Sequence, residues 1–374
     1  MFEDEVTQVV GAKGRHDPER RANRHGHESR RLPLGGRLVR VARPRIRTTN
    51  GEEVDLKTYR VFSSRDLLRE VALGRMLAGL STRRYRAGLE PVGKAAPPQG
   101  TSRSAVSRRF VAGTAAKLAE LFGRDLSGLD LLAVFIDGMT VGGHLIVVAL
   151  GVDAAGRKHP LGLWEGTTEN KAVCSALLSN LIDRGLPTER ALLFVIDGGK
   201  GIRSAVTAVW GELALIQRCR KHKRANVTEH LPKTEQLFIS RKLTKAWSNP
   251  DAAAAERELR ALARALQARH PGAAGSVLEG LEETLTVTRL GLTPSLCRTF
   301  KTTNPVESMI SIARDTSRNV KRWRDGRMAL RWTAAGMLEA EKQFRRVNGY
   351  RDLHVLKRAL ERHQEVIEDR KKIA

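Results

Sequence analysis

Two apolar runs that each end in an aspartate constrain the fold of this chain more than any other feature. Residues 131–136 (LLAVFI) lead directly into Asp137, and residues 191–196 (ALLFVI) lead directly into Asp197. An unbroken apolar run of this length beside turn residues is typical of a strand buried on both faces. If the two strands are neighbours, both carboxylates emerge at one edge of the sheet. Since Asp-Gly is a common turn pair, each aspartate alone is also explained by turn formation.

Strand and helix patterns alternate around these two runs. Further strand patterns lie at residues 145–150, 161–164 and 213–216, and helical patterns lie at residues 167–185 and 201–210. This order predicts an α/β domain in which helices flank a mixed sheet. Residues 220–300 break the alternation with mainly helix-forming sequence. They indicate an all-helical insertion within the sheet domain.

The charge of the chain narrows the class of partner. Its formal net charge is +25, because 66 Lys and Arg residues outnumber 41 Asp and Glu residues. A globular protein this basic is expected to bind a polyanion, most commonly nucleic acid. No stretch approaches the roughly 18 apolar residues of a membrane-spanning helix, and residues 1–10 lack a secretory pattern. Three widely spaced cysteines favour a reducing compartment. We therefore expect a cytoplasmic protein with no membrane partner.

The N-terminal part of the chain begins with a polar segment. Residues 1–35 are rich in Arg, His and Gly, so we expect them to be disordered. Residues 36–54 show β-branched alternation and an Asn50-Gly51 turn, which favour a basic hairpin. Helical patterns follow, including a helix expected to open at Ser81.

A second helix start suggests how this region would contact DNA. The sequence SRSAVSRRF, residues 102–110, follows the Ser81 segment in a helix-turn-helix-like order. Ser104, Arg108 and Arg109 would open the recognition helix, where short hydroxyl and guanidinium side chains suit phosphate and guanine contacts. An ordinary basic helix in a helical bundle is the alternative.

The two aspartates predict a metal site if they lie together. Neighbouring carboxylates repel each other, and such a pair persists best with a cation between them. Oxygen ligands without a nearby His or Cys favour Mg²⁺ or Mn²⁺, bound together with a substrate phosphate. Glu307 is our candidate for a third ligand. In TTNPVES, however, Asn304 reads as an N-cap and Glu307 as the third helical residue of a capping box.

Basic residues follow Glu307 at helical spacing. Arg314, Arg318 and Lys321 lie 7, 11 and 14 residues further on, which places them on the same face of a continuous helix. Together with Arg322 and Arg324, they are predicted to bind DNA beside the metal site. A solvated basic face is the alternative.

Three further motifs bear on cofactors and base contacts. Cys219 and His222 form a Cys-x-x-His pair, but a structural zinc site needs four ligands and no second pair has suitable spacing. We therefore do not expect zinc. The DGGKGIRS segment lacks the spacing of a phosphate-binding P-loop, so no nucleotide cofactor is expected. Trp247 in the basic insertion could stack on an unpaired base, with burial in a core as the alternative.

Four motifs occur in order along the chain. They are FIDGMTVGGHLIVVALGVDAAGRKHPLGLWEGTTEN (135–170), LLFVIDGGKGIRSAV (192–206), IQRCRKHKRANVTEHLPK (216–233) and TTNPVESMI (302–310). Together they resemble the Mutator-type bacterial insertion-sequence transposases, over about residues 36–350. The resemblance implies a DDE transposase whose RNase H-like catalytic domain is interrupted by a helical insertion.

This resemblance also implies residue roles. It places the catalytic acids on Asp137, Asp197 and Glu307, as ligands of two Mg²⁺ or Mn²⁺ ions. One ion would activate a water and later a DNA 3′-hydroxyl, and the other would stabilise the leaving oxygen. The family's Cys-x-x-His pair falls on Cys219 and His222, which are expected to support the site.

The implied organisation has six segments. They are a disordered N-terminus (1–35), a DNA-binding region with helix-turn-helix-like helices (36–126), the first part of the catalytic core (127–219), the helical insertion (220–300), the part of the core with the third acid (301–348) and a charged C-terminal helix (349–374).

The resemblance finally implies a function. We expect a DNA transposase that cleaves the ends of its own insertion sequence and transfers the 3′-hydroxyl ends into target DNA. Its partners would be the terminal inverted repeats, target DNA and further copies of itself, in a dimer or higher assembly associated with a bacterial nucleoid. A DNA-binding regulator derived from a transposase and a nuclease of the same fold without strand transfer are the alternatives.

Overall fold

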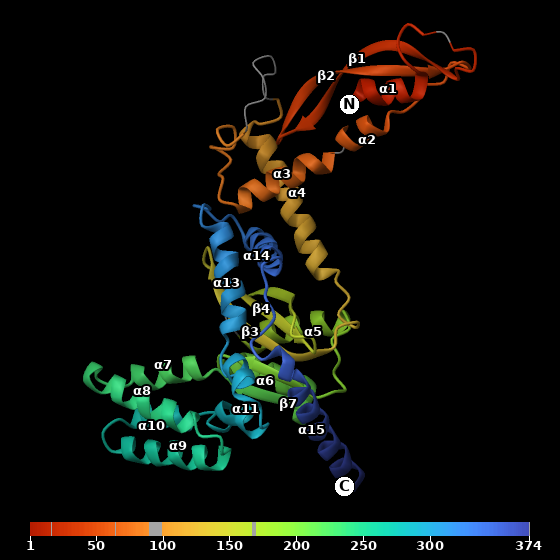
Figure 1. Cartoon of the computed structure of the whole chain (residues 1–374). Helices are drawn as coiled ribbons and strands as arrows, with labels where there is room; N and C mark the ends of the chain where they lie inside the picture. The colour runs from red at the N-terminus through yellow and green to blue at the C-terminus, as the bar shows by residue number, and fades with distance from the viewer. Residues whose placement is uncertain (16, 64, 90–98, 167–169, 374) are drawn as a thin grey trace. The chain divides into compact units, whose positions relative to one another are not determined.

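The structure is a computed structural model that describes residues 1–15, 17–63, 65–89, 99–166 and 170–373 (Figure 1). It divides into two compact units. The N-terminal unit comprises Met1–Ala116 with Thr316–Val320, and the sheet unit comprises Lys117–Asp315 with Lys321–Ala374. The first three residues of the helix expected at 167–185 lie outside the described residues. Within the described ranges, no helix is both long enough and apolar enough to cross a membrane.

A long hairpin occupies the part of the N-terminal unit that was expected to be disordered. Strand β1 (Ala22–Leu34) pairs antiparallel with β2 (Arg37–Thr48), and helix α1 (Phe2–Val10) precedes them. The connecting Gly35 and Gly36 have φ values of 55° and 84°, the positive values that a two-residue hairpin turn requires. The expectation of disorder in residues 1–35 was therefore wrong. The sequence signal was weak because β1 is mostly exposed and carries few apolar residues.

The helices of the N-terminal unit also differ from expectation. They are α2 (Lys57–Ser63), α3 (Arg65–Leu77) and α4 (Arg103–Phe122), the last of which runs on into the sheet unit. Residues 82–88 form turns instead of a helix opening at Ser81. Tyr85 explains the difference, because its side chain is fully buried and its hydroxyl donates a hydrogen bond to the Gly36 carbonyl at 3.2 Å. Burial against the hairpin therefore overrides the local helical pattern.

The sheet unit contains the expected mixed sheet. Its strand order is β5-β4-β3-β6-β7, in which β3 (Leu131–Val141), β4 (His144–Asp153) and β5 (Lys158–Gly166) are antiparallel. Strands β6 (Leu192–Ile196) and β7 (Ala214–Arg218) continue the sheet in parallel with β3. The predicted α/β class with a mixed sheet is confirmed.

Helices cover both faces of this sheet. On one face, Val134 and Ile136 join a core with helices α5 (Lys171–Asp183) and α6 (Lys200–Trp210). On the other, Phe135 stacks on Phe300 with ring centroids 5.8 Å apart. The same core includes residues of α13 (Asn304–Ser317), α14 (Gly326–Glu341) and α15 (Leu353–Ile373). Because both faces are buried, apolar side chains are favoured at every position of these strands.

The segment between β7 and α13 is helical, as predicted for residues 220–300. Its helices are α7 (Arg220–Glu229), α8 (Lys233–Trp247), α9 (Ala252–Gln267), α10 (Pro271–Leu278), α11 (Thr286–Arg289) and α12 (Pro294–Phe300). Helices α7 to α10 share a core of their own. Trp247 lies in that core with 8% of its surface exposed, and its indole Nε1 donates to Thr284 Oγ1 at 3.1 Å. Base stacking by Trp247 was therefore the wrong alternative.

The helix that carries Glu307 is shorter than its sequence pattern predicted. Helix α13 ends at Ser317, and residues 318–325 connect it to α14 without helical structure. Trp323 holds this connection in place, because its ring lies against Trp332 with centroids 6.3 Å apart and against Gly142 in the β3–β4 turn. Asp325 then caps α14 by accepting from the Met328 N–H. The continuous basic helix expected beyond residue 317 is therefore wrong.

Candidate active site

The two aspartates lie next to each other on adjacent chain segments of the sheet. Strands β3 and β6 pair in parallel with Ile136 opposite Ile196. Asp197 directly follows the last residue of β6, whereas Asp137 lies within β3, opposite Val148 of β4. Each side chain also accepts a local hydrogen bond, at 2.9 Å from the Gly138 N–H and at 2.8 Å from the Gly199 N–H. The turn alternative was wrong for Asp137, because β3 continues through Gly138 to Val141. Only Asp197 begins a segment that leaves its strand, and parallel pairing of β3 with β6 brings the two carboxylates together.

Asp137 lies in an environment that disfavours its negative charge. Only 8% of its surface is exposed. Burial, then the charge of Asp197 and to a lesser extent that of Glu307, raises the pKa of Asp137 to about 6, although His222 acts in the opposite direction. Clustered carboxylates with a raised pKa are a favourable setting for a bound cation.

This shift predicts how the metal-free protein responds to pH. The folded chain binds the Asp137 proton more tightly than the unfolded chain, so this group's contribution to stability falls as pH rises from about 4 to about 6. Asp137→Asn should therefore increase the free energy of unfolding at pH 7 by on the order of 2–3 kcal/mol. The gain should almost vanish near pH 4. Urea denaturation of both proteins in EDTA measures this difference, and a gain of equal size at both pH values would contradict the assignment.

Glu307 lies in the first turn of α13 and faces cationic side chains. Its Oε2 accepts from Lys221 Nζ at 2.5 Å, and its Oε1 accepts from Thr303 Oγ1 at 2.8 Å and lies 3.7 Å from His222 Nε2. Burial opposes its ionisation, but the Lys221 and Thr303 hydrogen bonds hold the pKa of Glu307 below its usual value. Glu307 therefore remains ionised at neutral pH.

The capping-box alternative for Glu307 does not describe these contacts. In a capping box the glutamate accepts from the backbone N–H of the N-cap residue. Helix α13 begins at Asn304, and the N–H of the preceding Thr303 donates to Cys219 Sγ at 3.4 Å. The Glu307 carboxylate instead contacts the Thr303 hydroxyl and Lys221. The Glu307 carboxylate is therefore not used as a helix cap, and its charge acts on Asp137.

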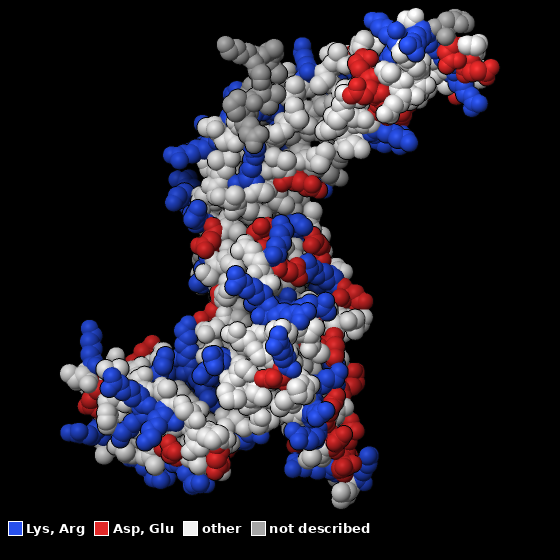
Figure 2. All heavy atoms as spheres, viewed as in Figure 1, with Lys and Arg blue, Asp and Glu red and all other residues white. Residues whose placement is uncertain are grey.

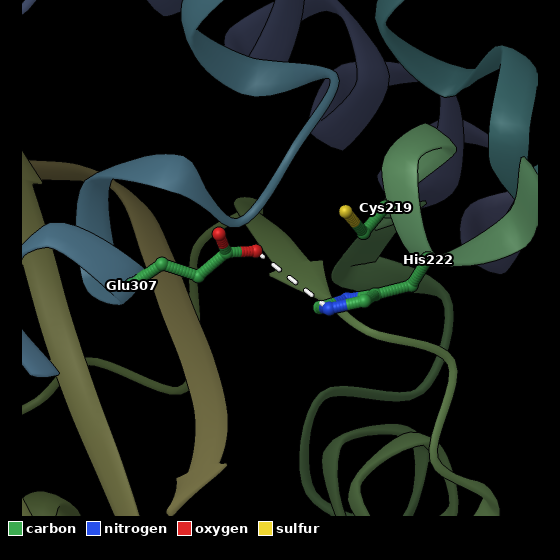
Figure 3. A group of neighbouring side chains, drawn as sticks. All are labelled: Cys219, His222 and Glu307. Carbon is green, nitrogen blue, oxygen red and sulfur yellow. Dashed lines mark ion pairs between the residues drawn. The ribbon is translucent and has the colours of Figure 1, made fainter. Parts of the chain in front are cut away.

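Cys219 and His222 line this site (Figure 3). One ligand atom each from Cys219, His222 and Glu307 lies within 4.8 Å of the other two. Cys219 is fully buried directly after β7. A hydrogen bond between the Cys219 sulfur and His222 raises the pKa of His222 to about 9, and the charges of Asp137 and Glu307 contribute less. Burial raises the pKa of Cys219. Hydrogen bonds with His222 and Thr303 together lower it by more, so the net shift is downward.

The donor chemistry of the site fits a divalent cation. Asp137, Asp197 and Glu307 offer the hard oxygen ligands that Mg²⁺ and Mn²⁺ prefer. Cys219 and His222 offer softer atoms on one side of Glu307 only, and the described residues provide no fourth ligand to complete a closed zinc set. The site therefore fits an ion held by carboxylates and a substrate.

Two contributors to this site were missed by sequence reasoning. Lys221 lies within the Cys-x-x-His segment, and its ion pair with Glu307 depends on how α7 meets α13. Thr303 is fully buried and connects Cys219 to Glu307 through its hydroxyl. No local sequence pattern predicts this role for either residue, although Lys221 lies in the motif at 216–233 and Thr303 in the motif at 302–310.

The predicted DNA-binding residues are distributed over both units. Ser104 and Arg108 are exposed in the first turns of α4, whereas Arg109 is half-buried and its guanidinium donates to the Gly100 carbonyl. Arg314 is exposed two turns after Glu307 on α13. The remaining residues are exposed but lie beyond the end of that helix: Arg318, Lys321, Arg322 and Arg324.

Comparison with known proteins gives a consistent result. The model of the Mutator family of transposases matches residues 1–347. The chain is 31% identical over 176 residues to the transposase for insertion sequence element IST2 of Acidithiobacillus ferrooxidans, covering 47% of this chain and 58% of that protein. It is 29% identical over 203 residues to the IS6120 transposase of Mycolicibacterium smegmatis, covering 52% and 61%. It is 26% identical over 358 residues to the ISRM5 transposase of Rhizobium meliloti, covering 94% and 87%.

Proposed function

Because this chain belongs to the Mutator family of transposases, we propose that it cleaves DNA at the ends of its own insertion sequence and joins the 3′-hydroxyl ends to target DNA. The observation that carries this proposal is the parallel pairing of β3 with β6, which sets Asp137 beside Asp197, together with the electrostatic effect of Glu307 on Asp137. A protein that only binds DNA has no use for three buried or half-buried acids at one place.

The side chains have distinct roles in this proposal. Asp137 and Asp197 would be the central ligands of two Mg²⁺ or Mn²⁺ ions, and Glu307 would be a further ligand of one of them. Bound ions of this kind lower the pKa of an attacking water or hydroxyl and stabilise the leaving oxygen of an in-line displacement. Thr303 holds the Glu307 carboxylate, and Cys219 holds Thr303, through the hydrogen bonds described above. Lys221 and His222 place positive charge where the substrate phosphate would approach.

The N-terminal unit is proposed to recognise the ends of the element through Arg108. Arg108→Ala should weaken binding to the end DNA by about tenfold, because a lost arginine contact to a base or phosphate costs about 1–3 kcal/mol. The thermal stability of the protein should be unchanged, since Arg108 is exposed. Arg109→Ala should instead lower thermal stability by removing the hydrogen bond to Gly100. Electrophoretic mobility shifts and thermal denaturation separate the two effects, and unchanged binding by Arg108→Ala would exclude the recognition role.

A plasmid assay tests the proposed reaction. A supercoiled plasmid that carries the DNA flanking this gene is incubated with the protein and Mg²⁺ or Mn²⁺, and new 3′ ends are mapped. We expect metal-dependent breaks at the flanks, followed by joined products. Breaks without joined products would identify a nuclease, and tight binding without breaks under either metal would identify a DNA-binding regulator.

Transposition of two ends implies more than one copy of the chain. We propose a dimer or a higher assembly on paired ends, because two ends must be cut and joined in concert. Sedimentation of the protein with paired-end DNA measures the stoichiometry, and monomers alone would refute this part of the proposal.

A further inference from the structure

A basic cavity lies beside Glu307 within the sheet unit. Its volume is about 250 Å³, and the helical insertion and the start of α13 form its walls. Its polar lining includes Arg220, Lys221, Arg224, Lys301, Thr302 and Asn304. Among the described residues that line it, none is acidic. Figure 2 shows Lys and Arg side chains gathered over the surface of this insertion.

The cations of this cavity differ in what they already bind. The Arg220 guanidinium is buried and donates to the Thr284 and Trp247 carbonyls at 2.8 and 2.9 Å, so it forms a fixed wall. Lys221 pairs with Glu307. Arg224 is exposed and Lys301 is half-buried, and neither forms an ion pair with any residue that the structure describes. Two cations therefore face the cavity without a carboxylate partner.

The floor of the cavity contributes groups that suit an oxyanion. Thr302 is 91% buried (9% exposed), and its hydroxyl has no hydrogen-bond partner among the described residues. Asn304 is the first residue of the 14-residue helix α13. Pro305 has no N–H, so Asn304 and Val306 supply the N–H groups at this end of the helix, where an anion is favoured. A cavity of about 250 Å³ has room for one phosphate group.

We propose that this cavity, here called the phosphate cavity, binds a backbone phosphodiester of the DNA strand that is cut, next to the scissile phosphate. The inference rests on the proposed function, because it takes DNA as the substrate. Lys221 supports the placement, since it lines the cavity and also contacts Glu307. A phosphate held there lies one lysine side chain away from Glu307. Binding it would fix which phosphodiester of the strand reaches the proposed catalytic site.

The salt dependence of DNA binding tests the phosphate cavity without cleavage. Arg224→Gln and Lys301→Gln are compared with Arg257→Gln, which removes an exposed positive charge from α9 of the same insertion. Kd for end DNA is measured in Ca²⁺ over a series of salt concentrations. Each cavity variant should bind about tenfold more weakly and should reduce the slope of log K against log salt by about one. Arg257→Gln should match the wild type. Equal slopes for all four proteins would overturn the proposal.

A modified DNA strand tests which phosphate is bound. Single neutral methylphosphonates are placed along the strand near the cleavage site. In the wild type and in Arg257→Gln, a methylphosphonate at one position beside the scissile phosphate should weaken DNA binding about tenfold. The double variant Arg224→Gln/Lys301→Gln should show no loss at that position. The same loss in all proteins would place that phosphate elsewhere and overturn the proposal.

Two further controls are needed. They distinguish binding of a free anion from binding of DNA, and failure of the cavity proposal from failure of the proposed function. Calorimetry with inorganic phosphate alone reports binding of a free anion. Suppose that the cavity variants lose phosphate binding while the salt dependence of their DNA binding stays that of the wild type. That result would assign the cavity to a free anion and reject the DNA phosphodiester. Thermal denaturation confirms that each variant is folded. If the wild type binds DNA with the predicted slopes but never cuts it, the proposed function fails, whereas the binding of a DNA backbone phosphodiester in the cavity stands.

Discussion

Asp197→Asn should reduce cleavage of the flanking DNA by about three orders of magnitude while leaving DNA binding close to that of the wild type. The substitution keeps the shape of the side chain and removes the charge of one proposed metal ligand at the edge of the sheet. Loss of several kcal/mol of charge stabilisation in the transition state corresponds to a rate change of this size. Single-turnover cleavage of a labelled end in Mg²⁺ measures the rate, and mobility shifts in Ca²⁺ measure binding.

Asp183→Asn is the matched control for this experiment. Asp183 is exposed at the end of α5 in the same unit. It carries the same charge but lies at the end of a helix and not on the paired segments that carry Asp137 and Asp197. Its variant should cleave at the rate of the wild type. Cleavage by Asp197→Asn at the rate of this control, with the same products, would remove Asp197 from the proposed site.

Gly198→Ala should also cause a large loss of cleavage, because it displaces the turn that follows Asp197. Gly198 has a φ of 107°, and a Cβ at this position would overlap the Arg218 guanidinium. That guanidinium cannot move easily, since it is buried and bonded to the Glu279 carbonyl at 3.0 Å and to Glu279 Oε2 at 3.1 Å. We expect the free energy of unfolding to fall by about 1–3 kcal/mol. Cleavage should fall more than tenfold, because a small displacement of Asp197, a proposed metal ligand, is costly.

Gly211→Ala separates backbone strain from crowding. Gly211 has a φ of 54°, but no described atom lies within 4 Å of an added Cβ. Its variant should lose about 1–2 kcal/mol of stability and retain the cleavage rate of the wild type. Urea denaturation and the single-turnover assay measure both quantities. Equal cleavage by the two variants would show that the Asp197 turn tolerates the overlap with Arg218.

The parts of the fold that could be predicted are those where one local pattern has one physical cause. The apolar runs before Asp137 and Asp197 are strands because both faces of the sheet are covered. The helical insertion was recognised from its helix-forming composition. In both cases burial or helix propensity acts on every residue of the segment, so the signal is strong.

The parts that could not be predicted depend on contacts between distant segments. Strand β1 is mostly exposed and is held by pairing with β2, so its own sequence shows little. The turns at residues 82–88 depend on burial of Tyr85, and the end of α13 lies just before the segment that Trp323 anchors. The ion pair between Lys221 and Glu307 joins residues 86 positions apart. No local pattern encodes such a distance.

The helical insertion also delays the synthesis of Glu307 relative to that of Asp137 and Asp197. Glu307 follows Asp197 by 110 residues (307 − 197), an interval that translation at about 5–20 residues per second fills in roughly 5–20 s. The hairpin, α4 and strands β3 and β6 are all synthesised before that interval begins. A ribosome that stops within the insertion therefore releases a chain that contains Arg108 and both aspartates but has no Glu307. Interrupted synthesis thus yields a product that lacks the third carboxylate from the start.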